Sequence, residues 1–146
     1  MRIALLLLPL ALVACDKSEA DPRLALCVSA ARQAATNRGS VRMVHFEATP
    51  KNVKEAASVG GKALIDFDAA NSYDGKRRAS GTCEFAPHPA TDHKGSFLLT
   101  SAVFGTIRLT DQQLAEANAL DGSSRAVMEA INAAEMLRAE KTGEPK

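Results

Sequence analysis

Two alternating segments on either side of a short turn constrain the fold of this chain more than any other feature. In "KALIDFDAA" (62–70), apolar and polar residues alternate with the period of a half-buried strand. "NSYDG" (71–75) has the composition of a turn, and "RRASGTCEFA" (77–86) alternates again. We therefore predict a β-hairpin with one buried face. The residues predicted to face inward are Ala63, Ile65, Phe67, Ala69, Ala79, Cys83 and Phe85.

Helices are predicted before and after this hairpin in the sequence. Asp21-Pro22 is a typical helix start, and Arg38-Gly39 supplies a basic last turn and a glycine stop. Thr110 to Gln113 has the form of a capping box, and Asp121-Gly122 separates the helix behind it from a last one. The predicted apolar stripes are Leu24, Cys27, Val28, Ala31, Ala34 and Ala35, then Leu114, Ala117 and Leu120, then Val127, Ala130, Ile131, Ala134 and Leu137.

Further strands are expected from "VRMVHFEA" (41–48) and from the most apolar segment, "GSFLLTSAVFGTIRL" (95–109). Residues 50–60 fit either a short helix or a strand, and the pattern does not decide between them. The predicted class is α+β: an N-terminal helix packed on an antiparallel sheet of three or four strands, followed by two C-terminal helices.

The composition fits a single globular domain. The chain has 146 residues, 46% hydrophobic and 24% charged. We expect one α+β domain over 22–140 and a flexible tail over 141–146. The 18 Lys and Arg residues nearly balance 17 Asp and Glu, which argues against nucleic acid as a partner.

Residues 1–14, "MRIALLLLPLALVA", have the order of a secretory signal peptide. Arg2 precedes an apolar run from Ile3 to Val13, and the small residue Ala14 follows. The run is well short of the roughly 20 residues that span a bilayer, so a permanent transmembrane helix is the weaker interpretation. An ordinary cleaved signal is one alternative for this leader.

Leu12-Val13-Ala14-Cys15 resembles the lipobox of bacterial lipoproteins. The resemblance implies cleavage before Cys15, lipid on its thiol and usually an acyl chain on the new amino terminus. Residues 15–21 would then be the lipidated cysteine and a short tether. Asp16 would favour the inner membrane under the enterobacterial rule, although an outer-membrane location or a plain polar tether stays open. The expected location is the periplasmic side of a cell membrane.

The two other cysteines, Cys27 and Cys83, form an even pair in a chain that we expect to be exported. Such a pair favours one disulfide, closing a loop of about 56 residues. Two buried free thiols and a redox pair are the alternatives. "IDFDAANSYDG" followed by "CEF" also resembles a pattern in small exported bacterial proteins of unknown function, which supports the hairpin and the disulfide.

Several polar groups are candidates for a site. Asp66 and Asp68 share one strand face and could hold a cation, and His88 and His93 lie in one proline-rich loop and could hold a metal. For both pairs, a simple exposed surface is the favoured interpretation. The basic cluster Lys76-Arg77-Arg78 could touch anionic headgroups or an acidic partner, or simply keep a hairpin soluble. His45 has no assigned role.

The expected function is a membrane-anchored, non-catalytic interaction or accessory module of the cell envelope. No catalytic motif is recognisable in the sequence, so we expect no enzyme activity and no cofactor. The expected partners are the membrane, through lipid on Cys15, and an envelope protein. The alternatives are a metal- or small-ligand-binding periplasmic protein and a cell-envelope hydrolase.

Overall fold

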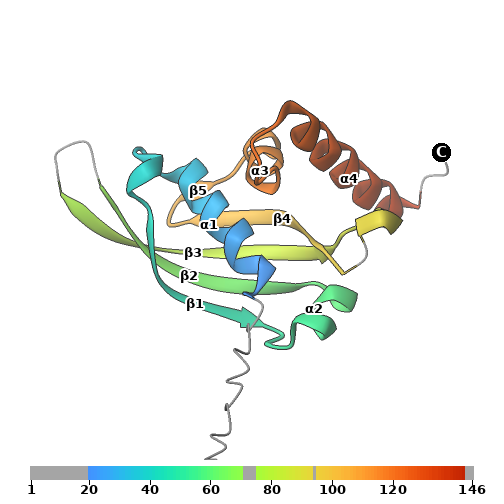
Figure 1. Ribbon diagram of the computed structural model, residues 1–146, viewed down its shortest axis with the longest axis horizontal. Coiled ribbons are helices and arrows are strands. Elements are labelled where there is room, and N and C mark those ends of the chain that lie inside the picture. Colours follow the sequence, from blue (N-terminus) through green and yellow to red (C-terminus); the bar gives the residue numbers. More distant parts are fainter. Residues whose placement is uncertain (1–19, 71–74, 94, 144–146) are drawn as a thin grey trace, which may run out of the picture.

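The computed structural model describes residues 20–70, 75–93 and 95–143, which form an antiparallel sheet with helices packed against it (Figure 1). The sheet has five strands in the order β1-β2-β3-β4-β5. The elements in chain order are α1 (Pro22–Ala34), a 3-10 turn (Arg38–Ser40), β1 (Arg42–Thr49), α2 (Val53–Val59), β2 (Gly61–Ala70), β3 (Lys76–Pro87), a second 3-10 turn (Thr91–His93), β4 (Phe97–Phe104), β5 (Ile107–Arg108), α3 (Asp111–Asn118) and α4 (Ser124–Thr142).

Strands β2 and β3 form the predicted antiparallel pair, with Ala63 opposite Cys83 and Phe67 opposite Ala79. Ile65 and Phe67 are buried on the inner face, where the Phe67 ring meets the Phe104 ring edge to face at 5.6 Å. Gly81 of β3 lies directly under Phe104, so a Cβ at this position would collide with the ring. The alternation in the sequence therefore identified the core face correctly.

The α+β class is confirmed, but the order of elements differs from the prediction in two places. The sheet has five strands instead of three or four, because β4 turns back at Gly105 (φ 60°) into the two-residue strand β5. The ambiguous segment 50–60 contains helix α2, inserted between β1 and β2. The Asn52 side chain accepts hydrogen bonds from the Lys54 and Glu55 backbone N–H groups, and this N-cap stabilises the helix over the competing alternation.

Cys27 and Cys83 form the predicted disulfide, which joins α1 to β3. Both residues are completely buried, and their Cα atoms are 5.9 Å apart. Ala30 and Ala31, also fully buried, let the helix approach the sheet closely. The buried face of α1 is rotated slightly from the predicted stripe, since Leu26 is buried in place of Leu24.

The capping box at the start of α3 is present, with the Gln113 N–H donating to Thr110 Oγ1 and the Thr110 N–H to Gln113 Oε1. Leu120 was predicted to belong to the buried stripe of this helix, and it is 58% exposed. The helix ends at Asn118, so Leu120 no longer follows the helical repeat.

The predicted signal peptide, Cys15 and Asp16 lie outside the described residues, and so does the end of the predicted tail, 144–146. α4 continues past residue 140 to Thr142. No helix in the part of the chain that the structure describes is long and apolar enough to cross a bilayer.

Candidate binding cleft

A cleft of about 450 Å³ lies where the start of α1, the β3–β4 connection, the α3–α4 turn and the first half of α4 meet. Its floor is apolar, formed by the buried side chains of Leu26, Phe97 and Leu98. Polar groups from separate elements line its walls and rim, namely His88, His93, Ser96, Asn118, Asp121 and Glu129. An apolar floor with a few converging polar groups is the usual form of a binding site.

The β3–β4 connection holds two imidazole rings against each other. The His88 and His93 ring centroids are 4.4 Å apart. Backbone bonds close the loop, from the His88 N–H to the Ser96 carbonyl (2.9 Å) and from the Ser96 N–H to the His93 carbonyl (2.9 Å). The Ala90 N–H donates to His88 Nδ1 (3.3 Å). The loop is therefore closed by its own hydrogen bonds, and both histidines line the cleft.

His88 is neutral at physiological pH. Burial lowers its pKa below the usual value, and the neighbouring His93 lowers it further, although Asp92 and Glu129 act in the opposite direction. Since Nδ1 already accepts a hydrogen bond, the neutral ring carries its proton on Nε2. The electrostatic character of the cleft is then set by its carboxylates, Asp121 and Glu129.

A second hollow of about 540 Å³ lies against the second half of α4. It lies between the Pro87-His88-Pro89 segment and the α4 residues Met136, Leu137 and Glu140. His88 lines both the cleft and this hollow.

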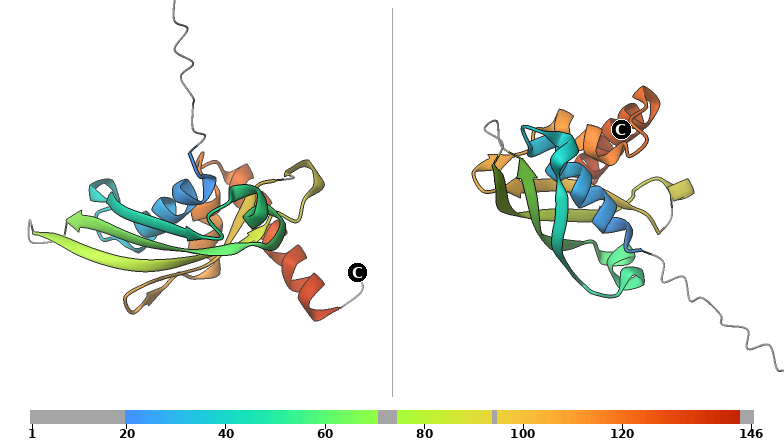
Figure 2. Two further views of the ribbon diagram at one scale, coloured as in Figure 1. Left: turned by 90° about the horizontal axis from the view of Figure 1, so that it is seen from below. Right: turned by 60° about the vertical axis from the view of Figure 1, so that its left-hand side comes forward.

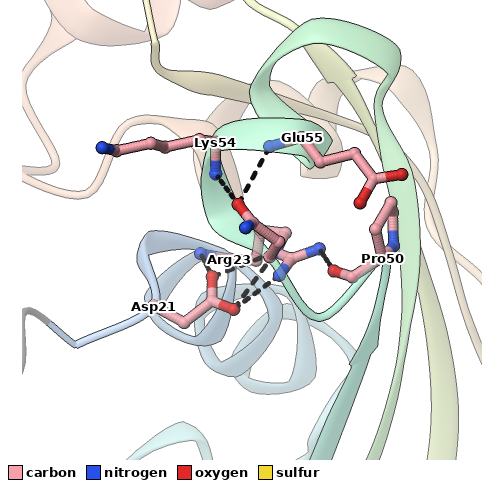
Figure 3. A network of polar contacts seen from close by, with 6 residues as sticks. Asp21, Arg23, Pro50, Lys54 and Glu55 are labelled. Carbon is pink, nitrogen blue, oxygen red and sulfur yellow. Dashed lines mark hydrogen bonds and ion pairs between the residues drawn. The ribbon is translucent and has the colours of Figure 1, made fainter.

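Arg23 contacts Phe97 of the cleft floor, and the sequence analysis missed it. The side chain is fully buried, and its guanidinium bonds both carboxylate oxygens of Asp21 and the Pro50 carbonyl (2.7 Å) (Figure 3). It also lies 5.5 Å from the centre of the Phe97 ring. A basic residue in the first turn of a helix is unfavourable, because the helix dipole is positive at that end. Its presence there was the one sign in the sequence that Arg23 has a specific partner.

The predicted carboxylate pair lies on the outer face of the sheet, away from the cleft. Asp68 bonds Arg78 (2.5 Å) and Asp66 accepts from the Ser80 hydroxyl (2.5 Å). The bond from Arg78 holds the pKa of Asp68 below its usual value. Both carboxylates are thus engaged by cross-strand neighbours. His45 is exposed, with its nearest carboxylate on Glu47 at 3.8 Å.

The other two members of the predicted basic cluster, Lys76 and Arg77, are exposed at the start of β3. Arg78, the third, is held by Asp68. The cluster therefore lies at the turn end of the β2–β3 hairpin, on the opposite side of the molecule from the end of α4 in Figure 1 and in the left view of Figure 2.

No group of three or more His, Cys, Asp or Glu side chains among residues 20–70, 75–93 and 95–143 is placed to hold a metal ion. The histidine pair brings together two of the predicted ligands without a third. Comparison with known proteins returned no matching family model, curated protein or solved structure.

Proposed function

We propose that this chain is a membrane-anchored periplasmic lipoprotein and that its folded domain is a non-catalytic interaction module of the cell envelope. The observation that carries the proposal is the cleft between α1, the β3–β4 connection and α4. An apolar floor bordered by polar groups suits recognition of a ligand or partner segment.

The position of the cleft agrees with anchoring through Cys15. Pro22, the first residue of α1, lines the cleft, so the chain that leads to Cys15 enters the fold at the cleft's edge. Seven residues reach at most about 25 Å when extended. The cleft of a lipidated chain would lie close to the periplasmic surface of the membrane, with the inner membrane favoured by Asp16.

Binding needs fewer assumptions than hydrolysis at this site. A hydrolase requires a nucleophile activated by an adjacent base. Ser96 supplies the cleft hydroxyl nearest in sequence to the histidines. Its backbone carbonyl accepts from the His88 N–H, and its N–H donates to the His93 carbonyl. No hydrogen bond joins its hydroxyl to either imidazole within the described part of the cleft.

The anchoring half of the proposal is tested on the intact chain in bacteria. We expect mass spectrometry to find Cys15 as the lipidated amino terminus and the protein in the membrane fraction. The Cys15→Ser variant should lose the lipid and the lipoprotein-type cleavage. Normal processing of this variant would refute the anchoring.

The binding half is tested by photocrosslinking in cells. A photoreactive amino acid at Leu120, on the cleft rim, should give a discrete crosslinked product. The same group at Val59 of α2, which is 70% exposed and is not part of the cleft, serves as the control. Equal products from both positions, or none from Leu120, would refute the cleft as the interaction surface.

A metal-binding function is the second candidate, favoured by the adjacent His88 and His93 rings. Calorimetric titration of the purified chain with Cu(II) and Zn(II) tests it directly. Binding that disappears in a His88→Gln variant would support a metal site, and flat isotherms would reject it.

A further inference from the structure

We propose that the cleft and the hollow beyond His88 form one groove along α4 that binds an extended segment of a partner protein carrying basic residues among large apolar ones. This inference rests on the proposed interaction function and specifies the chemistry of the partner. It follows from the continuity, the charge and the length of the groove.

One face of α4 supplies a wall along the whole groove. Ala126 and Glu129 border the cleft, and Met136 and Glu140 border the hollow. These positions recur at helical spacing over about 21 Å of helix. His88 borders both parts and connects them on the opposite wall. A groove of this length suits an extended peptide of about six residues better than a compact small molecule.

The charge of the groove is complementary to a basic segment. Three carboxylates line it, from Asp121, Glu129 and Glu140, and none of its described lining residues is Lys or Arg. His88 does not offset them, because its pKa is lowered. Complementary charge of this kind steers association and selects partners.

The groove also offers apolar contact. Leu120 at one end is 58% exposed and Met136 at the other is 40% exposed, with buried Phe97 and Leu98 between them on the floor. Exposed methionine is common at surfaces that bind peptides. A purely ionic partner would leave these side chains in water, so the partner segment is expected to carry apolar residues as well.

The spacing of the carboxylates defines the spacing of the basic groups. Glu129 and Glu140 lie three turns apart on α4, about 16 Å, which corresponds to about five residues of an extended chain. Because side chains alternate in an extended chain, two basic side chains on one face are an even number of residues apart. A spacing of four residues covers about 13 Å, and the long arginine side chains span the remaining distance. Glu129 currently binds the guanidinium of Arg125 at 2.9 Å, and Arg125 is 89% exposed. A basic group from the partner would replace Arg125 there.

Three fluorescein-labelled peptide amides test the proposal by fluorescence anisotropy with the full chain in detergent micelles. LRLSLRL has two arginines four positions apart on one face and leucines on the other, LELSLEL reverses its charge, and GRGSGRG lacks its apolar residues. We expect LRLSLRL to bind and the other two to bind at least about tenfold more weakly. Equal binding of LELSLEL or GRGSGRG would overturn the proposal, and so would no binding by LRLSLRL.

Substitutions on α4 locate the binding to this groove. Glu129→Gln and Glu140→Gln should each weaken LRLSLRL binding about two- to fivefold, the range for an exposed ion pair. Arg125→Gln should strengthen it by about twofold, because it removes the competitor for Glu129. Glu135→Gln and Arg138→Gln make the same charge changes on the α3 side of α4 and should leave the affinity unchanged.

An equal effect of Glu135→Gln and Glu129→Gln would refute the groove as the binding surface. All of these residues are exposed or half-exposed, and unchanged thermal melting confirms that each variant is folded. The proposed function would survive a negative peptide result if Leu120 still crosslinks in cells. Failure of both experiments would instead remove the cleft as an interaction surface.

Discussion

Arg23 is a charged side chain that the fold has taken completely out of water. A buried guanidinium is tolerated only where its donors are paired. The pairing here comes from Asp21, two residues before it, and from the Pro50 carbonyl in the β1–α2 connection. Arg23 therefore connects the start of the folded domain to a turn far away in sequence, and it holds Phe97 on the cleft floor.

Replacing Arg23 with Ala should lower the free energy of unfolding by about 3 kcal/mol, since it leaves a cavity and removes the partner of Asp21. Urea denaturation followed by circular dichroism measures this. Arg32→Ala, on the exposed side of the same helix, is the control and should change stability by less than about 0.5 kcal/mol. A similarly small loss for Arg23→Ala would mean that the buried network does not stabilise the fold.

His88 makes the stability depend on pH. Burial, then the charge of His93, lowers the pKa of folded His88 below the unfolded value of about 6.5. The unfolded chain therefore binds a proton at His88 more readily than the folded chain does. The contribution of neutral His88 to the free energy of unfolding is complete above pH 6.5 and is lost as the pH falls below that value. Urea midpoints at pH 7.5, 6.5 and 5.5 should fall less steeply in His88→Gln than in the unchanged chain. Parallel slopes would contradict the role of His88.

Among the elements, α1 and β3 are connected covalently by the Cys27–Cys83 bond. The cysteines are 56 residues apart, and the chain-entropy model gives about 4 kcal/mol for closing a loop of that length in the unfolded chain. The Cys27→Ala/Cys83→Ala variant should lose about this much stability in urea denaturation.

Burial provides an independent check on the disulfide. Both cysteines are 0% exposed, so alkylation after mild reduction should be slow in native buffer and rapid in urea. Fast alkylation of the native chain, or a double variant as stable as the original, would contradict the described role of the bond.

Asn118 lets α3 cover an edge of the sheet. The Leu99 N–H donates to Asn118 Oδ1 (2.8 Å), and Asn118 Nδ2 donates to the Leu99 carbonyl (2.9 Å). The side-chain amide thus stands in for a neighbouring strand at a point that β5 does not reach, since β5 pairs only with Val103 and Phe104.

Asn118→Ala would leave both Leu99 backbone groups without these partners, and Leu99 is buried. The expected loss is about 2 to 4 kcal/mol. Hydrogen exchange should also show lower protection of the Leu99 amide. Gln112→Ala, on the exposed side of α3, is the control and should change neither measurement. Unchanged protection of Leu99 would rule out this edge contact.

The contrast between α2 and the hairpin shows what local pattern can predict. Ile65 and Phe67 were placed correctly because side chains alternate between the two faces of a strand. When only one face is buried, just one assignment puts the apolar residues inside. The α2 segment carried two compatible patterns, and the Asn52 cap decided between them. Strand β5 was missed because two residues carry no periodicity.

The cleft could be predicted only in pieces. His88 and His93 were singled out because they share a short loop, and the structure confirms that they lie together. Glu129 and Leu120 come from other elements, and their approach to that loop depends on how α4 packs. Arg23 depends on Pro50, which is brought near by the path of β1. Such contacts are properties of tertiary packing and leave little trace in the sequence.

At the scale of the whole molecule, the start of the described chain and the cleft lie on the same side. The chain enters α1 beside the cleft, whereas the β4–β5 turn lies away from that entry in both views of Figure 2. A lipidated chain with a short tether should therefore hold the groove near the bilayer and the β4–β5 turn farther from it.

Energy transfer in vesicles measures this orientation. The lipidated chain is labelled through an unnatural amino acid at Leu120 or at Thr106, which spares the disulfide, and the vesicles carry a headgroup acceptor. Transfer should be stronger from Leu120, on the cleft rim, than from Thr106, in the exposed β4–β5 turn. A flexible linker of about 20 Gly and Ser residues, inserted after Ser18, has an end-to-end distance of about 25 Å. It should reduce transfer from Leu120 and make the transfer efficiencies of the two positions more similar. Equal transfer from both positions without the linker would show that the tether does not orient the domain, and the groove would then meet partners from any direction.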